Sequence, residues 1–105
     1  MSELRALYQQ AFDAFVKGDY DGAVAAYQRV LERDPRFGLA YQGLADVYSR
    51  QNRLDDAIAT IRKAIECDPA EALFHTSLSR FLQRQGRIPE AEEAAAVAAR
   101  MNARG

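Results

Sequence analysis

The sequence predicts an all-α protein of six helices, arranged as three antiparallel pairs that stack into a solenoid. Three observations predict this fold. A pattern of small, apolar and turn residues recurs every 34 positions in the 105-residue chain. Each period holds two stretches whose apolar residues follow the i, i+3, i+4, i+7 spacing of an amphipathic helix. Alanine, glutamine and arginine are frequent while valine and isoleucine are few, a balance that favours helix over strand.

The first repeat predicts helices over residues 3–17 and 20–33. Gly18 separates them, because glycine adopts without strain the left-handed conformation that ends many helices. Pro35 follows the second helix, and proline cannot continue the backbone hydrogen-bond pattern of a helix. The first repeat is therefore predicted to be a helical hairpin, with a turn at Gly18 and an end at Pro35.

The next two repeats predict the same hairpin twice more. Helices are expected over residues 37–51, 54–67, 71–85 and 88–102. Asn52 and Gly86 stand where Gly18 stands in the first repeat, and Pro69 stands 34 residues after Pro35. Pro89 falls in a first helical turn, where its missing N–H is harmless. No insertion interrupts the spacing, so we expect a single domain, residues 1–105, with repeats at about 4–37, 38–71 and 72–105.

Small residues recur where the two helices of each hairpin must cross closely. On the first helices they are Ala11, Ala45 and Ser79, and on the second helices Ala23, Ala57 and Ala91. Small side chains let two helix axes approach, and larger neighbours then fill the groove beside them. This pattern predicts that each repeat packs its two helices against one another.

The middle repeat carries a set of residues typical of a known family: Tyr41, Leu44, Ala45, Tyr48, Ala57, Ile61, Ala64 and Pro69. In these positions it resembles the tetratricopeptide repeat, and the resemblance extends over nearly the whole chain. It implies a right-handed superhelix of helix pairs. The first repeat departs from the pattern at Gln10 and Ala14, where Leu and Tyr are usual. The third departs at His75, Ala95 and Ala103, where a bulky residue, an aromatic and a proline are usual.

In that family the first helix of each pair lines a concave groove that holds a partner. The resemblance implies that the groove is lined by Arg5, Tyr8, Gln9, Phe12 and Phe15, by Leu39, Gln42, Gly43, Asp46 and Arg50, and by Leu73, Thr76, Ser77, Arg80, Gln83 and Arg84. Gly43 is expected to deepen the floor. One end is aromatic and the other is basic. The expected ligand is an extended or helical peptide with an apolar anchor near Tyr8 and Phe12 and carboxylates near Arg80 and Arg84.

A purely structural interpretation of the same residues competes with this one. Arg50, Arg80 and Arg84 suit helix ends, where cations interact favourably with the helix dipole. Tyr8 and Phe12 could instead pack within the first repeat or form a self-association patch. Both interpretations stay open at the level of sequence.

This reasoning predicts a protein–protein interaction adaptor that binds a peptide or a partner protein in the groove. The alternative is homo-oligomerisation through the terminal repeats, because the alanine-rich last helix has no further helix to cover it. RNA binding by a related helical repeat is a third possibility. A net charge of −1 disfavours it, since nucleic-acid binders usually carry a basic excess. We therefore expect no nucleic-acid partner.

Chaperone-binding members of the family hold a C-terminal carboxylate with Lys, Asn and Arg side chains. The matching positions here are Tyr8, Phe12, Gly43, Leu73 and Ser77, and none supplies such a group. We therefore predict that the chain lacks this clamp and does not bind heat-shock chaperone tails.

The chain offers no constellation of reactive groups, so no enzyme, metal site or cofactor is expected. His75 is the only histidine and is expected to pack between helices. Cys67 is the only thiol, expected as a small packing or partly exposed residue. Together they cannot supply the four ligands of a structural zinc site. No signal-peptide pattern precedes the first helix, and no apolar run approaches the ~18 residues of a membrane helix. These absences predict a cytoplasmic protein without a membrane partner.

Overall fold

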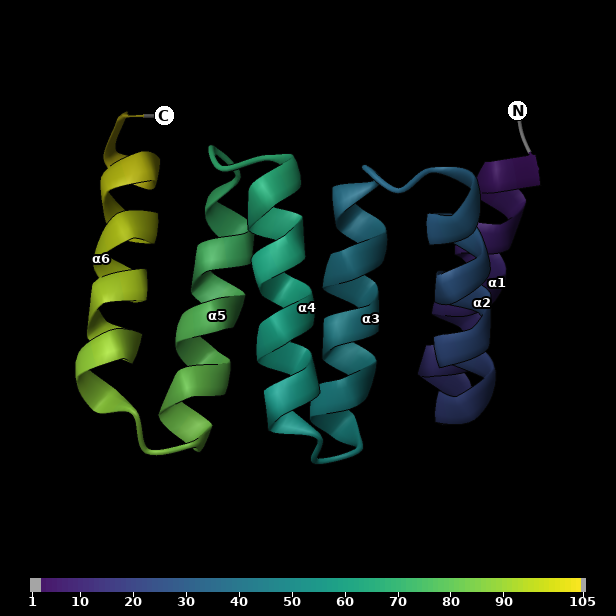
Figure 1. The fold of residues 1–105 in the computed structure, drawn as a ribbon, viewed down its shortest axis with the longest axis horizontal. Coiled ribbons are helices and arrows are strands. Elements are labelled where there is room, and N and C mark those ends of the chain that lie inside the picture. The colour runs from purple at the N-terminus through teal and green to yellow at the C-terminus, as the bar shows by residue number, and fades with distance from the viewer. Residues whose placement is uncertain (1–2, 105) are drawn as a thin grey trace.

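A computed structural model describes residues 3–104 and shows six helices in that part of the chain. They are α1 (Glu3–Lys17), α2 (Tyr20–Arg33), α3 (Gly38–Arg50), α4 (Leu54–Cys67), α5 (Ala72–Arg84) and α6 (Ile88–Arg104). Consecutive helices run antiparallel and follow one another from the N-terminal to the C-terminal end, with α1 behind α2 in the view of Figure 1. The all-α solenoid expected from the repeat is therefore confirmed.

The predicted helix bounds are close to the observed ones. α1, α2 and α4 match, while α3 and α5 each lose one residue at both ends. α6 runs to Arg104, two residues beyond the expected end at 102. Ala103 stands there in place of the proline that ends the other repeats, and alanine continues a helix readily.

The turn inside each hairpin is the same structure repeated three times. Gly18, Asn52 and Gly86 all have positive φ, at 84°, 62° and 77°. In each turn the following backbone N–H reaches back to a helical carbonyl; that of Arg53, for example, donates to the Tyr48 carbonyl at 2.8 Å. This bond satisfies a carbonyl that the helix end leaves free. Asparagine tolerates the left-handed conformation, which explains why Asn52 can replace glycine.

The turns between repeats are also equivalent. The Tyr41 hydroxyl donates to the Pro35 carbonyl at 3.0 Å, and His75 Nε2 donates to the Pro69 carbonyl at 3.0 Å. His75 therefore takes the place of a tyrosine at its repeat position and holds the same turn. The expectation that His75 has a structural role is confirmed.

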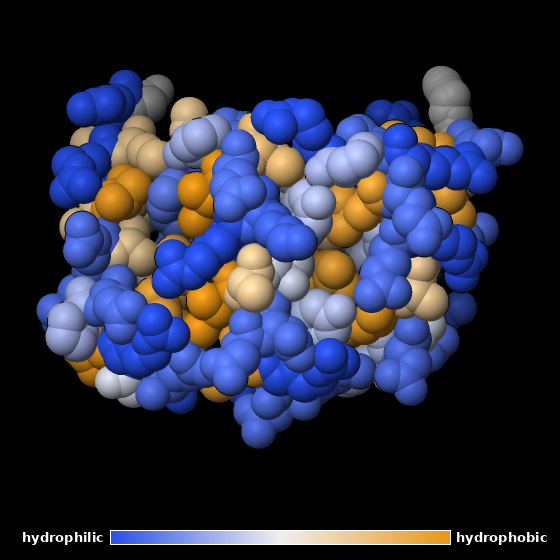
Figure 2. Space-filling model, in the orientation of Figure 1, coloured by the Kyte–Doolittle hydropathy of each residue, from blue (hydrophilic) through white to orange (hydrophobic). Residues whose placement is uncertain are grey.

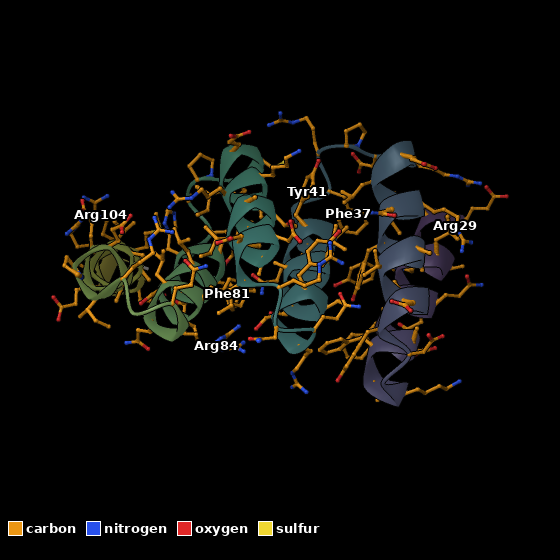
Figure 3. All side chains as sticks on the ribbon, turned by 60° about the horizontal axis from the view of Figure 1, so that its bottom comes forward. Arg29, Phe37, Tyr41, Phe81, Arg84 and Arg104 are labelled. Atoms are coloured by element: carbon orange, nitrogen blue, oxygen red, sulfur yellow. The ribbon has the colours of Figure 1, made fainter. Side chains whose placement is uncertain are left out.

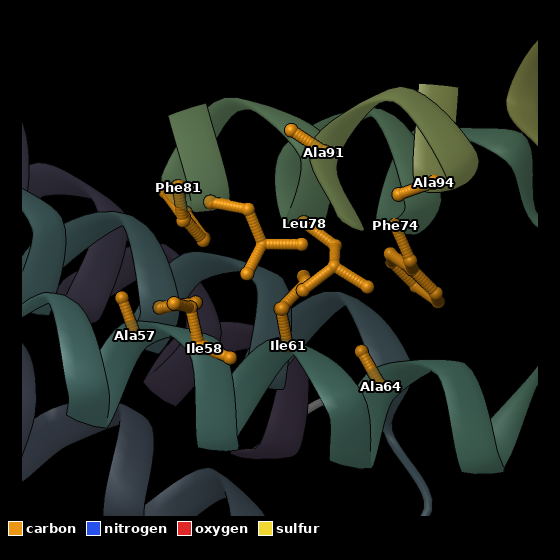
Figure 4. Packing of buried hydrophobic residues seen from close by; sticks show 11 residues of the cluster. Ala57, Ile58, Ile61, Ala64, Phe74, Leu78, Phe81, Ala91 and Ala94 are labelled. Carbon is orange, nitrogen blue, oxygen red and sulfur yellow. The ribbon is translucent and has the colours of Figure 1, made fainter. Parts of the chain in front are cut away.

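The core consists of two clusters, one at each junction between repeats. In the first, Ala40, Leu44 and Val47 of α3 pack with Ala11, Tyr27 and Val30 of repeat one. In the second, Phe74, Leu78 and Phe81 of α5 pack with Ala45, Ile61 and Ala64 of repeat two. Figure 4 shows the α5 side chains facing the row of α4 residues. Each repeat thus buries its apolar surface against the next one, as expected of a solenoid.

The small residues predicted at the helix crossings are buried. Ala23, Ala57 and Ala91 are each 0 % exposed. The outer surface is mostly polar: in Figure 2, hydrophilic residues cover most of the face shown, and apolar residues appear in smaller patches between them.

Candidate functional site

Four predicted groove residues of α3 and α5 meet in one hollow of about 440 Å³, together with Phe15. We call it the arginine hollow, and it is lined by Phe15, Asp46, Ser49, Arg50, Arg80 and Arg84. The 34-residue period explains the convergence, because Asp46 and Arg80 hold equivalent positions, as do Arg50 and Arg84. Equivalent positions on neighbouring first helices face the same side of a solenoid.

A chain of hydrogen bonds crosses the floor of the arginine hollow. The Ser77 hydroxyl donates to Gln42 Oε1 at 3.0 Å, and Gln42 Nε2 donates to both Asp46 oxygens at 3.2 Å. Arg80 Nη2 then donates to Asp46 Oδ1 at 3.3 Å. The chain ties α5 to α3 and orients the Asp46 carboxylate toward Arg80.

The other two arginines are also held in place. The Arg50 guanidinium lies over the Phe15 ring, 5.4 Å from its centre. Arg84 Nη1 donates to the Ser49 carbonyl at 3.2 Å, so its side chain reaches from α5 to the end of α3 (Figure 3). A guanidinium has five N–H donors, so these contacts leave donors for a ligand. Phe15 and Ser49 thus fix the direction of two cationic groups.

Two predicted groove residues do not reach the surface. Gln42 is 8 % exposed and Ser77 is 0 % exposed. Both side chains are used in the chain of hydrogen bonds described above, so they position Asp46 and are not open to a ligand. The prediction was wrong for Gln42 and Ser77 because it assigned neighbouring residues of one helix to the same face. Successive side chains on a helix point about 100° apart, so one of two neighbours can point into the protein.

Gly43 does not deepen the floor of the groove as expected. A Cβ at this position would lie 2.3 Å from the Cζ atom of Tyr27. The Tyr27 ring, which is 2 % exposed, therefore occupies the space that the glycine leaves. Gly43 is needed for α2 to pack against α3, and burial raises the pKa of the enclosed Tyr27 hydroxyl.

The aromatic end of the predicted groove divides into a packed part and an exposed part. The Tyr8 ring stacks on Phe37 at 5.2 Å and meets Tyr27 edge-on at 5.9 Å, so it joins α1 to α3. Phe12 is 46 % exposed, and Val16, one turn further along α1, is 66 % exposed. Phe12 is thus the predicted aromatic that remains open to solvent. Val16 and Ser49 were not predicted to line the groove. Two spacings could have identified them: Val16 lies four residues after Phe12 on the same helix, and Ser49 lies one 34-residue period after Phe15.

The remaining predicted residues lie outside the arginine hollow. Arg5 and Gln9 are exposed on α1, where Gln9 Nε2 donates to Asp13 at 2.9 Å. Leu39 and Leu73 are exposed near the starts of α3 and α5. Thr76 and Gln83 line a second hollow between α5 and α6, which Arg80 also borders. The predicted residues thus form several surface features, and the arginine hollow is the one that gathers three arginines.

Burial raises the pKa of the Asp46 carboxyl above its ordinary value, although Gln42, Arg80 and Arg50 act in the opposite direction. The folded chain therefore binds this proton more tightly than the unfolded chain does, and ionisation of Asp46 costs stability as pH rises through the raised pKa. We expect Asp46→Asn to be more stable than the wild type at pH 7, with the difference shrinking as pH falls through the raised pKa and gone below the ordinary Asp value of about 4.

Urea denaturation of both proteins at pH 7 and at pH 3 measures this difference. Asp13→Asn, an exposed change on α1, is the control and should show no comparable gain. A variant at Asp46 that is less stable than the wild type at pH 7 would show that the attraction of Arg80 outweighs the cost of burying the carboxylate.

The described residues offer little other chemistry. Within residues 3–104, no three His, Cys, Asp or Glu side chains gather as metal ligands would. Cys67 is half-buried, and its Sγ lies 3.9 Å from the Pro35 carbonyl. In the same part of the chain, no helix is both long and apolar enough to cross a bilayer.

Comparison with known proteins places the chain in a family. The family model described as "Tetratricopeptide repeat" matches residues 14–80, and a second model of the same description matches residues 72–100. The chain is similar to the transcription factor tau 131 kDa subunit of Saccharomyces cerevisiae, with 39 % identity over 54 residues. This match covers 51 % of the chain but only 5 % of the yeast protein.

Solved structures agree with the family match. The translocator chaperone SycD of Yersinia enterocolitica, in its alternative dimer, has a TM-score of 0.93 at 25 % identity, covering 98 % of this chain and 79 % of that one. SycD in complex with a peptide of the translocator YopD has a TM-score of 0.90 at 24 % identity, covering 96 % and 78 %.

The TPR2B domain of yeast Sti1, in a complex with pHsp70, has a TM-score of 0.92 at 24 % identity, covering 96 % of this chain and 81 % of that one. These likenesses extend along all three repeats, and the family model alone spans more than half of the chain. The chain belongs to the tetratricopeptide repeat family.

Proposed function

We propose that this chain is an adaptor that holds a peptide segment of a partner protein on its concave face, without catalysing a reaction. The observation that carries the proposal is the arginine hollow, where three arginines surround one carboxylate. The chain as a whole has a net charge of −1, so this local excess of positive charge is a feature of the site. It suits an acidic peptide.

Arg50 and Arg84 provide the charge for this ligand. Among the ion pairs of residues 3–104, Arg80 is joined to Asp46, while neither Arg50 nor Arg84 has an acidic partner within 4.0 Å. Their side chains are already oriented by Phe15 and Ser49, so a carboxylate would order them at little further entropic cost. Arginine also binds a carboxylate in a two-pronged geometry, which adds specificity.

Phe12 and Val16 provide an apolar contact at the other end of the same ligand. They lie four residues apart on α1 and are both exposed, so they form one face of the helix. An apolar side chain of the peptide would pack there, while its acidic residue lies in the arginine hollow. The proposed ligand therefore combines an apolar anchor with an acidic group.

The family supports an interaction role in general terms. The SycD structure with a YopD peptide and the Sti1 domain with pHsp70 are complexes of the same fold with a partner. The partner of this chain is a separate question. We expect no binding of a heat-shock chaperone tail, because the clamp positions hold Tyr8, Phe12, Gly43, Leu73 and Ser77.

Selection from a displayed library of random peptides tests the proposal. With the wild-type chain as bait, we expect enriched peptides to carry Asp or Glu together with an apolar residue. A selected peptide should bind Arg50→Glu at least about tenfold more weakly, since loss of a charge-assisted contact costs over 1.4 kcal/mol. Raised salt should weaken the wild-type complex as well.

Arg29→Glu is the matched control. It makes the same change of charge on α2, where Arg29 is exposed and outside the arginine hollow. Binding should be nearly unchanged in this variant. Enrichment of basic peptides, or equal weakening by both substitutions, would contradict the proposed site. A heat-shock chaperone tail peptide should show no binding to the wild type.

A further inference from the structure

A second hollow lies at the C-terminal end of the solenoid, between α5 and α6. It has a volume of about 400 Å³ and we call it the C-terminal hollow. It is lined by Thr76, Ser79, Arg80, Gln83, Ala95, Ala98, Ala99 and Asn102. Arg80 borders both hollows, but the α6 residues line only this one.

Most of the equivalent positions in repeat two are covered by a helix. Counting back 34 residues from the lining gives Gln42, Ala45, Asp46, Ser49, Ile61, Ala64, Ile65 and Asp68. α5 packs on this surface: Phe74, Leu78 and Phe81 share a cluster with its apolar members. Its polar members accept hydrogen bonds from α5 as well, at Gln42, Asp46 and Ser49.

Several of the equivalent positions are covered in repeat one too, although Phe12, the equivalent of Arg80, is 46 % exposed. They include Ala11, Tyr27 and Val30, which share a cluster with Ala40, Leu44 and Val47 of α3. Two of the three equivalent surfaces are therefore interfaces for a helix. The C-terminal hollow is the third, and no helix of residues 3–104 covers it.

The residues that line the C-terminal hollow indicate how large the side chains of a docking helix must be. α6 has Ala95 and Ala99 where α4 has Ile61 and Ile65. Ala95 and Ala99 are exposed, while Ile61 is 0 % exposed. A helix that lies here meets smaller neighbours than α5 does, so it needs large apolar residues to fill the space.

A second copy of this chain does not supply such a helix by continuing the stack. On α1, the positions equivalent to Phe74, Leu78 and Phe81 are Ala6, Gln10 and Asp13. All three are exposed, and two of them are polar. Because α1 presents no large apolar residue on that face, head-to-tail stacking would leave the C-terminal hollow unfilled.

We propose that the C-terminal hollow docks an amphipathic helix of a partner protein, with large apolar residues at i, i+4 and i+7 and an acidic residue at i+6. The apolar spacing is that of Phe74, Leu78 and Phe81 in the equivalent interface. When Phe74 is counted as position i, Arg80 of α5 stands at i+6, and it pairs with Asp46 in the equivalent surface of repeat two. In the C-terminal hollow the residue equivalent to Asp46 is Arg80 itself, so the incoming helix needs the opposite charge.

A peptide of residues 71–85 of this chain, with Arg80→Glu, is a probe for this surface. It contains the required apolar residues and the acidic one. We expect the fluorescein-labelled peptide to bind the full chain in fluorescence polarisation, and to bind an Ala95→Glu protein at least about tenfold more weakly, as expected when a charge enters an apolar contact. The unaltered 71–85 peptide, with Arg at that position, should also bind more weakly.

Ala96→Glu is the matched control, since Ala96 is exposed on the same helix but lies outside the hollow. This variant should bind the probe as the wild type does. NMR spectra of the ¹⁵N-labelled wild-type chain give a second readout that needs no substitution: adding the probe should shift the amide signals of Gln83 and Asn102 and leave those of α1 unchanged.

Three results would overturn the proposal. The first is no binding of the probe and no shifted amide signal. The second is equal binding by the Ala95→Glu and Ala96→Glu proteins, with both folded by circular dichroism. The third is a wild-type dimer in analytical ultracentrifugation that Ala95→Glu converts to a monomer, because a second copy would then be the occupant. The comparison of Ala95→Glu with Ala96→Glu does not bear on peptide binding in the arginine hollow, because neither residue lines it.

Discussion

Replacing Phe81 with alanine is expected to lower the free energy of unfolding by about 3–5 kcal/mol, the usual range for a buried Phe→Ala change. Phe81 is 0 % exposed and lies in the cluster that joins repeats two and three. Its loss would leave a cavity between α4 and α5 that the neighbouring helices can fill only in part. Urea denaturation followed by circular dichroism measures the change.

Phe12→Ala is the control, because it deletes the same side chain from a site that is 46 % exposed. An exposed change of this kind should alter stability by about 0.5 kcal/mol or less. Similar losses in the two variants would mean that Phe81 is not part of a close-packed junction. Since each repeat of a solenoid contacts only its neighbours, a lost junction should also broaden the transition, as repeat three unfolds before the rest.

Gly43→Val should destabilise the chain by about 1–3 kcal/mol, through overpacking against Tyr27. A Cβ there would lie 2.3 Å from the Tyr27 ring, which is buried and cannot move aside freely. A glycine inside a helix normally lowers stability by about 1 kcal/mol relative to alanine. Replacing a helical glycine that has no buried ring beside it would therefore be expected to raise stability. A loss of stability in Gly43→Val would therefore report the contact between position 43 and the Tyr27 ring. A thermal melt should shift down by about 4–8 °C for each kcal/mol.

The Tyr27→Ala background tests the cause of that loss. Without the phenol ring, Gly43→Val meets no obstacle, and its cost should fall or change sign. The coupling between the two changes should reach about 0.5–3 kcal/mol, as for other residues in direct contact. An unchanged cost in the Tyr27→Ala background would show that Gly43 is needed for another reason.

The ends of the solenoid differ because each departs from the repeat in its own way. Gln10 stands where repeats two and three have Leu44 and Leu78, which makes the outer face of α1 polar. Ala95 stands where repeat two has Ile61, which leaves the other end hollow. The first departure leaves the outer face of α1 polar, and the second leaves a hollow at the C-terminal end, where we propose that a partner helix binds.

The fold could be predicted from the sequence because it depends on local signals that repeat. Gly18, Asn52 and Gly86 ended helices where they were expected to, since a left-handed residue acts within its own turn. Apolar spacing identified the six helices for the same reason. The longer α6 also follows from the sequence, because Ala103 cannot stop a helix as proline does.

The resemblance of the sequence to a known family also predicted that the first helix of each pair lines a groove, and four of the charged residues predicted there gather in one hollow. Only the tertiary structure decided what each of them does. Arg80 is paired with Asp46, Ser77 is buried beneath it, and Tyr27 fills the space left by Gly43. These contacts join residues of different helices, and they depend on the rotation of each helix about its axis. A period of 34 residues specifies that a face recurs, but packing against the neighbouring repeat sets which side chains on that face meet solvent.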